Sequence, residues 1–349
     1  MRAAVMTNWT MRVEDIDVPR PSAGQVLTKV RACGICGSDL HMLAHGAEQR
    51  ALSEQWSNWA DPPAIPTTMF SPDRGCVMGH EFCCEVVEIG SGVSGIDVGD
   101  VVVSMPALVD AGGMHPLGYS NEYNGGYAEM MVLQAALALK VPNGCDAHLA
   151  ALTEPLAVGV HAVARSGIAP GNSAIVLGLG PVGLAVIAEL RMKGIGPIVG
   201  ADFSPRRREL AMTLGADLTV DPREVPAIEA WRSLNTTNER WVFEAVGVPG
   251  LIDDAMRMAP RGGHVLVVGV CMQPDTIAPL LGISRELSVQ FVLGYTPDEF
   301  AYSLRAIAEG RTDLAPLITG TVDVDGVPGA FDALGNPEAH AKIMVVPGT

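Results

Sequence analysis

The chain has 349 residues, of which 48% are hydrophobic and 18% charged, a composition typical of a folded globular protein. This length exceeds what one compact core normally holds, so we expect two domains. A formal net charge of −16 argues against nucleic acid and anionic membranes as partners, and no apolar run is long enough to cross a membrane. The chain has seven cysteines, an odd number, which argues against a disulfide framework. The N-terminal segment turns acidic before any stretch resembles a signal peptide, so we expect a cytoplasmic protein.

The first part of the chain, up to residue 156, predicts a β-rich domain with few helices. Apolar runs at residues 25–32, 85–89 and 100–105 have the length of strands, and turns rich in Gly, Pro and Asp separate them. We expect these strands to form a mostly antiparallel sheet.

From residue 157 onward, strand-like and helix-like segments alternate. Strands are expected at residues 174–177, 198–201, 241–245, 264–269 and 289–293, and helices at residues 157–166, 181–193, 205–214, 251–258 and 298–309. This alternation predicts an α/β fold with a doubly wound parallel sheet. Short β segments ending at 342–346 predict that residues 296–349 return to complete domain 1–156, which leaves 157–295 as an inserted dinucleotide-binding domain.

A glycine-rich turn follows the strand expected at residues 174–177. Gly178, Gly180 and Gly183 give the spacing G-x-G-x-x-G, and a helix is expected to begin at Pro181 and Val182. The first glycine permits the tight turn, the second lets a pyrophosphate approach the backbone, and the third lets the helix pack on the strand. The alternative is an ordinary glycine-rich turn without a ligand.

Asp202 ends the next expected strand, at the distance typical of an acid that binds the adenosine ribose hydroxyls. A carboxylate repels the additional phosphate of NADP, so this position favours NAD. Arg206, Arg207 and Arg208 follow one helical turn later and leave NADP open, since they can either pair with that phosphate or form a solvated helix face.

Ligand types that zinc prefers occur close together in the first domain: a thiolate, imidazoles and carboxylates. They lie in CGSDLH at residues 36–41 and in Gly79-His80-Glu81. Cys33 and Cys36 form a CxxC pair, but no second pair follows at the spacing of a zinc ribbon. Cys83-Cys84 lies in an apolar strand and is expected in the core.

Six motifs in order resemble the zinc-containing medium-chain alcohol dehydrogenase family over nearly the whole chain. They are CGICGSDLH (33–41), GHE (79–81), GGYAEM (125–130), EPLAVG (154–159), GLGPVG (178–183) and GGHVLVVG (262–269). The resemblance implies a GroES-like catalytic domain, a Rossmann cofactor domain, and hydride transfer between an alcohol and NAD. EPL at 154–156 resembles the polyol, butanediol and sugar dehydrogenase branch.

The resemblance also implies roles for individual residues of this chain. Cys36, His80 and Glu154 would bind a catalytic zinc ion. The alternative for Glu154 is that it only begins a helix before Pro155 and binds no metal. Ser38 and His41 would relay the alcohol proton, Asp39 would fix the His80 tautomer, and Glu81 would lie behind the metal. Further cofactor contacts are expected from Arg207, Val268, Gly269, Val270 and Leu293.

Two segments depart from the family pattern. Residues 96–130 contain no cysteine, so we expect no structural zinc ion and one zinc ion in total. Residues 42–78 form a longer stretch than the family norm, where Trp56 and Trp59 either line the substrate pocket or pack the loop onto the surface. The remaining histidines are expected to be structural.

Two rival functions remain at this point. A zinc-free quinone or enoyl reductase of the same superfamily would not need the predicted ligands, and a non-catalytic nucleotide-binding protein would not need the predicted proton relay. The resemblance implies a small alcohol or carbonyl compound as substrate and a homodimer or homotetramer.

Overall fold

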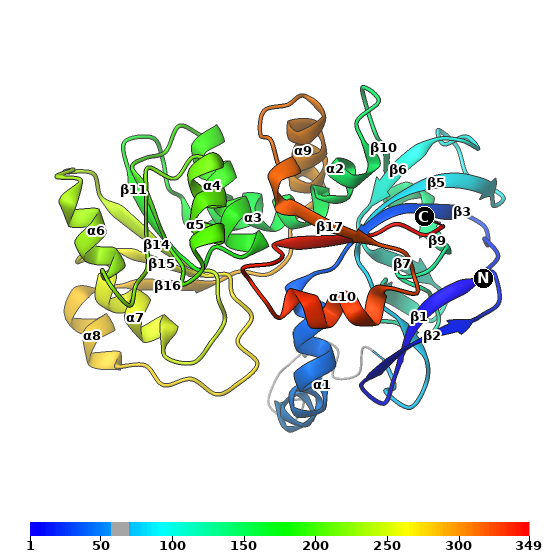
Figure 1. Ribbon diagram of the computed structural model, residues 1–349, viewed down its shortest axis with the longest axis horizontal. Helices are drawn as coiled ribbons and strands as arrows, with labels where there is room; N and C mark the ends of the chain where they lie inside the picture. The colour runs from blue at the N-terminus through cyan, green and yellow to red at the C-terminus, as the bar shows by residue number, and fades with distance from the viewer. Residues whose placement is uncertain (57–69, 349) are drawn as a thin grey trace.

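The computed structural model describes residues 1–56 and 70–348, which form a β-rich half and a half built on a parallel sheet (Figure 1). Both ends of the described chain lie in the β-rich half, and long helices lie between the two halves. The predicted fold class is confirmed.

The β-rich half contains a seven-stranded sheet of order β10-β6-β5-β3-β18-β17, with β9 also paired to β3, and a three-stranded sheet of order β2-β1-β4. The strands are β1 (Arg2–Thr7), β2 (Thr10–Asp15), β3 (Gln25–Gly34), β4 (Cys76–Val77), β5 (Glu81–Ile89), β6 (Val101–Ser104), β9 (Met130–Gln134), β10 (Ala138–Lys140), β17 (Ile318–Val322) and β18 (Lys342–Val345). Helical segments of this half are α1 (Gly37–Trp56), η1 (Ala135–Leu137), α2 (Ala147–Ala151), η2 (Ala315–Leu317) and α10 (Val327–Leu334). Cys83 and Cys84 are fully buried in β5, as expected.

The last strand joins the end of the chain to its beginning. β18 pairs antiparallel with β3, where Met344 lies opposite Gly34, and Gly34 in turn lies opposite Glu81 of β5. This register brings the start of β18, Lys342, beside the start of β5. The ends of three strands that are far apart in sequence therefore meet at one edge of the site.

The second half contains a six-stranded parallel sheet of order β13-β12-β11-β14-β15-β16. Its strands are β11 (Ser173–Leu177), β12 (Ile198–Ala201), β13 (Leu218–Val220), β14 (Arg240–Glu244), β15 (His264–Val267) and β16 (Ser288–Phe291), and its helices are α4 (Pro181–Met192), α5 (Pro205–Thr213), α6 (Ala227–Ser233), α7 (Leu251–Met258) and α8 (Pro279–Arg285). The strand order reverses between β11 and β14. Ligands of open parallel sheets bind at such a switch point, beyond the carboxyl ends of the strands.

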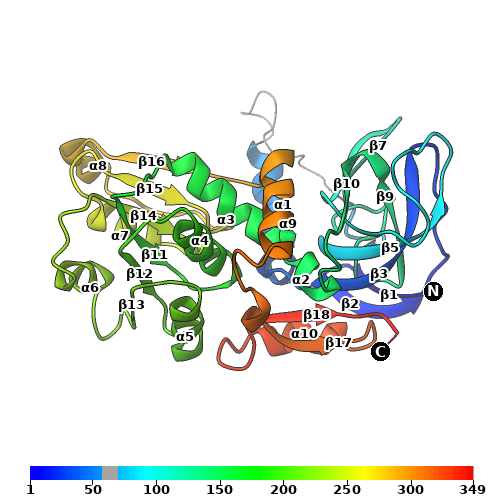
Figure 2. The ribbon, with the colours of Figure 1, turned by 90° about the horizontal axis from the view of Figure 1, so that it is seen from above.

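Two helices occupy the space between the halves, α3 (Thr153–Ser166) and α9 (Pro297–Ala308) (Figure 2). α3 packs against α4 and α9, and His161 of α3 contacts Glu299 of α9 at 2.9 Å. The side chain of Thr296 and that of Glu299 form a capping box that fixes the start of α9. These contacts hold the first turn of α3, which carries Glu154, at the boundary of the two halves.

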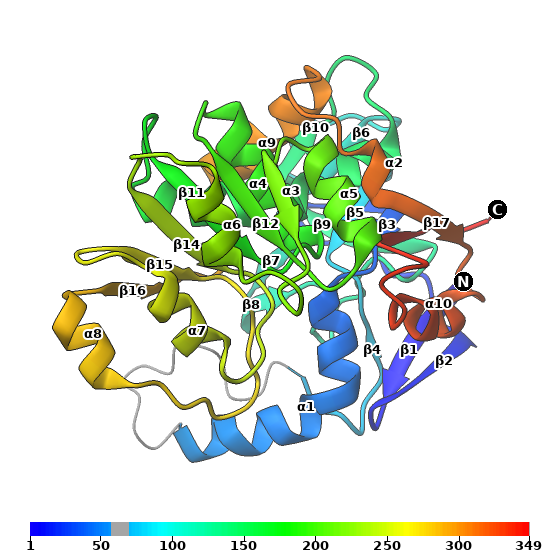
Figure 3. The ribbon, with the colours of Figure 1, turned by 60° about the vertical axis from the view of Figure 1, so that its left-hand side comes forward.

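The segment expected to be a long loop is partly helical. α1 extends from Gly37 to Trp56 and projects away from the β-rich sheets (Figure 3). The expectation of a loop is therefore wrong for residues 42–56. Trp59 and the side chain of Trp56 lie outside the described part of the chain, so their role stays a prediction. None of the helices in the described ranges is long and apolar enough to span a membrane.

The lobe without cysteines is closed by polar side chains. It contains the hairpin β7 (Ala107–Asp110) and β8 (Gly113–Pro116). Asp110 accepts a hydrogen bond from the backbone of Gly112 at 2.7 Å and from the Tyr123 hydroxyl at 2.8 Å, and its other contact is with His115 at 2.9 Å. The hydrogen bonds from His115, Tyr123 and the Gly112 backbone, in this order of size, lower the pKa of Asp110. One carboxylate thus ties together three parts of the lobe.

Candidate active site

A cavity of about 380 Å³ lies between the two halves. It is lined by Cys36, Gly37, Ser38, His41, His80, Glu81, Glu154, Pro155, Val158, Gly178, Gly180, Pro181, Val182, Asp202, Arg207, Ala245, Val246, Val268, Gly269, Val270, Val292, Leu293 and Gly294. Of the site residues expected from the sequence, all except Asp39 and Gly183 line it. The predicted metal, proton-relay and cofactor residues therefore share one space.

Three possible metal ligands lie at one end of the cavity. Single ligand atoms of Cys36, His80 and Glu81 lie within 4.8 Å of one another. Cys36 lies in the turn between β3 and α1, and His80 immediately precedes β5. A thiolate, an imidazole and a carboxylate at this separation fit the donor set of a zinc ion.

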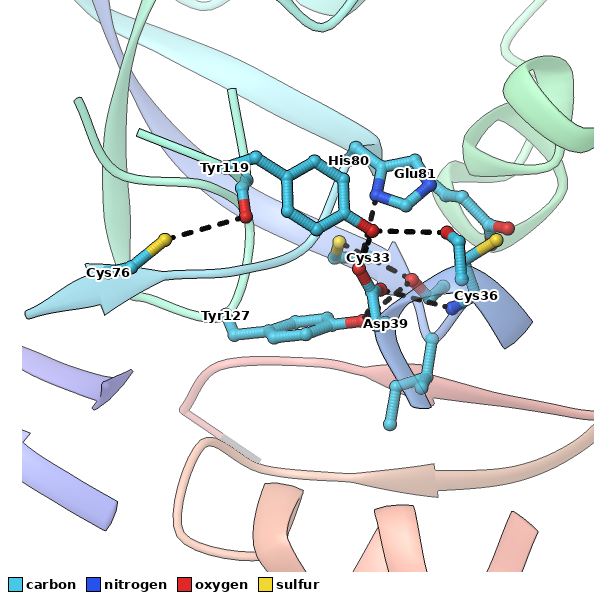
Figure 4. Close-up of polar contacts among 12 residues, drawn as sticks. Cys33, Cys36, Asp39, Cys76, His80, Glu81, Tyr119 and Tyr127 are labelled. Carbon is cyan, nitrogen blue, oxygen red and sulfur yellow. Dashed lines mark hydrogen bonds and ion pairs between the residues drawn. The ribbon is translucent and has the colours of Figure 1, made fainter. Parts of the chain in front are cut away.

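Asp39 lies behind His80 and is fully buried (Figure 4). The Asp39 Oδ1 atom lies 3.3 Å from His80 Nδ1 and accepts a hydrogen bond from the Tyr119 hydroxyl at 2.7 Å. Its Oδ2 atom accepts hydrogen bonds from the Tyr127 hydroxyl and from the Cys36 backbone N–H. Burial raises the pKa of Asp39, but His80 and the two phenols outweigh it and lower the pKa overall. With Nδ1 facing Asp39, the other ring nitrogen of His80 is left for the cavity.

Glu81 is paired with a lysine that the sequence analysis did not identify. Lys342 Nζ lies 2.7 and 2.6 Å from the two carboxylate oxygens of Glu81, and it also donates a hydrogen bond to the Ile35 carbonyl at 3.0 Å. Both side chains are fully buried. Burial lowers the pKa of Lys342, but the charge and hydrogen bonds of Glu81, together with the charges of Cys36 and Glu154, outweigh it and raise the pKa overall, so this lysine stays protonated.

Glu154 faces the same cavity from the first turn of α3. It does not belong to the close group formed by Cys36, His80 and Glu81. Burial raises the pKa of Glu154 to about 7, with His80 lowering it and Glu81 raising it further. Among the described residues, Glu154 has no ion pair within 4 Å, whereas both oxygens of Glu81 contact Lys342.

The two predicted relay residues lie in the first turns of α1. Ser38 lines the cavity, and its hydroxyl lies 3.1 Å from that of Tyr119. His41 also lines the cavity, and its ring stacks on that of His45 with centroids 6.4 Å apart. Burial, followed by the charge of His45, lowers the pKa of His41. His45, expected to be structural, therefore influences a predicted relay residue.

The glycine turn has the geometry expected of a dinucleotide site. Gly178 has a φ of +87°, which a side chain would strain, and a Cβ at Gly183 would lie 1.9 Å from the Gly178 carbonyl oxygen. A Cβ at Gly180 would meet no atom of residues 1–56 and 70–348 within 4 Å, so this backbone is open toward the cavity. Gly180 is also the N-cap of α4 and has no side chain to cap the helix, which leaves the N-terminal N–H groups for an anion.

Asp202 follows β12 and lies at the other end of the cavity. Its carboxylate accepts hydrogen bonds from the backbone of Leu179 and of Ser204, each at 2.8 Å. Arg207 lines the cavity 3.8 Å from this carboxylate, and its Nε atom has no hydrogen-bond partner among the described residues. Arg208 instead donates to the Asp202 and Phe203 carbonyls, and Arg206 is exposed. Of the three arginines, Arg207 faces the cavity.

Two family models and full-length relatives match this chain. Residues 22–143 match the alcohol dehydrogenase GroES-like domain, and residues 181–309 match the zinc-binding dehydrogenase. The chain is 32% identical over 358 residues to (R,R)-butanediol dehydrogenase of Bacillus subtilis (strain 168), with 99% of this chain and 100% of that protein covered. The chain belongs to the zinc-binding alcohol dehydrogenase family.

Solved structures agree with this assignment. The crystal structure of 2R,3R-butanediol dehydrogenase from Bacillus subtilis has a TM-score of 0.83 to this dehydrogenase, 31% identity and 99% coverage of both chains. A zinc-binding dehydrogenase from Sinorhizobium meliloti 1021, bound to NADP, has a TM-score of 0.82, 27% identity and 99% coverage of both chains. The predicted family and class of enzyme are confirmed, and neither rival function is favoured.

Four functional candidates of this dehydrogenase were missed by the sequence analysis: Lys342, Tyr119, Tyr127 and Tyr295. Lys342 opens a strand whose following residues are apolar, and a lone lysine beside such a run is a signal for a buried charge with a partner. Tyr295 follows β16 and forms a hydrogen bond with Glu154; burial and Glu154 raise its pKa well above the usual value. Nothing in the spacing of the tyrosines indicates that two of them meet Asp39.

Proposed function

We propose that the protein oxidises a secondary alcohol, diol, polyol or sugar, with NAD as the hydride acceptor and one zinc ion bound by Cys36, His80 and Glu154. The observation that carries this proposal is the single cavity, which joins Cys36 and His80 to the glycine turn and Asp202. This cavity would bring together a substrate oxygen bound at the metal end and the nicotinamide of a cofactor bound at the glycine turn. Bound zinc would polarise the alcohol oxygen and lower the pKa of its hydroxyl.

The choice of Glu154 over Glu81 as third ligand rests on their partners. Both oxygens of Glu81 accept from the buried Lys342, so this carboxylate already has a counter-charge. Glu154 faces the cavity, and its pKa is raised to about 7, first by burial. A buried acid without a fixed cation gains the most from a bound dication. Glu81 would then support the site from behind.

The proton of the alcohol would leave through Ser38 and His41. Ser38 lines the cavity from the first turn of α1, two residues after Cys36, where its hydroxyl can accept a proton from the substrate. His41 lies one helical turn further along and has a lowered pKa, so at neutral pH its ring is free to accept a proton. Its partial exposure allows exchange with water.

NAD is proposed over NADP because of Asp202. The carboxylate retains lone pairs after accepting from Leu179 and Ser204, and these can accept from the two ribose hydroxyls. A 2′-phosphate would meet the same carboxylate and be repelled. Arg207, which faces the cavity, would then contact the adenosine side of NAD rather than a phosphate.

A substrate screen combined with metal analysis tests this proposal. The purified protein should hold one zinc ion per chain and reduce NAD in the presence of at least one compound from a panel of secondary alcohols, diols, polyols and sugars. Cys36→Ser should lose both zinc and activity. A zinc-free preparation that reduces NAD at the same rate, or a zinc-loaded protein inactive on the whole panel, would contradict the proposal.

Assembly and location remain predictions. We propose a homodimer or homotetramer in the cytoplasm. Light scattering of the purified protein tests the assembly, and a monomer at micromolar concentration would contradict it.

A further inference from the structure

Tyr119 connects two parts of the site that the sequence analysis treated separately. Its hydroxyl lies 3.1 Å from the Ser38 hydroxyl and 2.7 Å from Asp39 Oδ1 (Figure 4). Ser38 faces the cavity, whereas Asp39 lies buried behind His80. The phenol therefore links the hydroxyl on the substrate side to the carboxylate on the protein side.

The hydrogen atoms in this chain of contacts have one consistent arrangement. The Asp39 carboxylate is surrounded by donors, because the Cys36 N–H and the Tyr127 hydroxyl both point at Oδ2. A phenol carries a single hydrogen, and Tyr119 donates it to Oδ1 of this acceptor-only group. The oxygen of Tyr119 can then only accept, so the contact with Ser38 requires that Ser38 donates.

A serine that donates its hydrogen toward Tyr119 presents lone pairs in its other directions. Since the Ser38 side chain lines the cavity, those lone pairs are available to a ligand there. An alcohol can donate to them, but a carbonyl compound has no hydrogen to offer. A serine oriented in this way therefore forms a hydrogen bond with the alcohol but not with the ketone.

We infer that Tyr119 is a positioning residue that holds the Ser38 hydroxyl as a hydrogen-bond acceptor toward the cavity, and thereby favours binding of the alcohol over its ketone. This inference rests on the proposed function, in which Ser38 contacts the reacting oxygen. Tyr119 itself does not line the cavity, so it acts through Ser38.

The chain offers a matched control for this role. Tyr119→Phe removes the hydroxyl but keeps the ring that lies against His80, with centroids 5.5 Å apart. Tyr127→Phe likewise removes one phenol that donates to Asp39, but within the described part of the chain the Tyr127 hydroxyl contacts Asp39 and the Gly34 carbonyl rather than Ser38. A purely structural effect through Asp39 should therefore be common to both variants.

The test measures dead-end complexes, in which no turnover occurs. Dissociation constants are determined by calorimetry for butan-2-ol with the zinc-loaded enzyme and NADH, and for butan-2-one with the enzyme and NAD. In Tyr119→Phe, the ratio of the alcohol constant to the ketone constant should rise about 3- to 10-fold, the effect expected of one neutral hydrogen bond. The ratio should stay unchanged in Tyr127→Phe, and Tyr119→Phe should no longer alter it in a Ser38→Ala background.

The outcomes separate this inference from the proposed function. If Tyr119→Phe weakens both ligands equally, or if Tyr127→Phe changes the ratio as much, Tyr119 has only a structural role and the inference is wrong, although the dehydrogenase function stands. If the wild-type protein binds neither ligand and oxidises no alcohol of the panel, the proposed function fails and the inference fails with it. Zinc content, measured for each variant, should equal that of the wild type.

Discussion

Replacing Lys342 by Met leaves the carboxylate of Glu81 buried without its counter-charge. Lys342 contacts both Glu81 oxygens within 2.7 Å, and neither side chain is exposed to water. Removing one member of a buried ion pair typically costs about 3–5 kcal/mol, because the remaining charge has neither water nor a partner. Met fills much of the same volume, so the loss reflects the charge and its hydrogen bonds more than a cavity.

The expected shift in melting temperature follows from the size of the chain. An unfolding entropy of about 2.1 cal/mol/K per residue gives about 0.7 kcal/mol per degree for 349 residues. Lys342→Met should therefore lower the melting temperature by about 4–7 °C if the chain unfolds as one unit. Calorimetry on metal-free protein measures this, since a bound cation would offset the freed carboxylate.

Two further variants make the test specific. Lys140→Met removes a half-exposed lysine that contacts Asp100 at 2.7 Å, and a solvent-exposed ion pair of this kind contributes little to stability. The Lys342→Met/Glu81→Gln double variant should recover most of the loss, because it leaves no uncompensated charge. The reasoning is refuted if Lys342→Met melts within 1 °C of Lys140→Met, or if the double variant is less stable than Lys342→Met alone.

Three shorter predictions concern the metal, the cofactor and the proton path. Cys36→Ser should reduce bound zinc from one ion per chain to a trace by mass spectrometry, and two tightly held ions in the wild type would contradict the single site. Asp202→Ala should raise the ratio of kcat/KM for NADP to that for NAD by about tenfold or more, since the repulsion of the 2′-phosphate is removed; a wild type that already prefers NADP would contradict this. His41→Gln should lower the rate of oxidation about 10- to 100-fold, with partial rescue by small amines. Because only neutral His41 accepts a proton and burial lowers its pKa, the wild-type rate should fall only below pH 6.5, and the variant should lack this acidic limb.

The parallel-sheet half could be predicted closely from the sequence. Apolar runs and turn residues predict five of its six strands and three of its five helices, whereas β13, α6 and α8 were not predicted. The helix expected at 205–214 is observed at Pro205–Thr213, where Ser204 caps it and Pro205 occupies the first turn. The glycine turn could be predicted for the same reason, because the backbone conformation that it requires is set by residues next to one another in the sequence.

α1 could not be predicted in the same way. Its sequence is polar over much of its length and contains Gly46, which weakens a helix in isolation. In the structure Gly46 lies against the ring of Trp9, where a Cβ would approach within 2.1 Å of the ring. The contact comes from the loop between β1 and β2, so this part of the helix depends on tertiary packing that has no local signal.

The motifs identified the residues of the site but not the contacts among them. Cys36, His80 and Glu154 could be named from their types and order, yet the partners of Glu81 and Asp39 depend on the sheet register and on a loop. Lys342 reaches Glu81 only because β18 pairs with β3 and β3 with β5. Residues separated by 261 positions in the chain share no pattern that a motif could contain.

The contacts of Glu81 and Asp39 together determine the charge at the metal end of the cavity. Three acidic side chains lie at the metal end. Lys342 neutralises the charge of Glu81, whereas two phenols and His80 stabilise the charge of Asp39 behind the ligand group without removing it. Glu154 has a hydrogen bond with Tyr295 but no ion pair within 4 Å in the described part of the chain, and its carboxylate and the Cys36 thiolate would supply two negative charges to a dication. If Lys342 were absent, the site would carry a third, and a divalent ion would leave it negative. The lysine at the end of the chain therefore sets the net charge of the ligand group, and through it how strongly a bound metal can polarise a substrate oxygen.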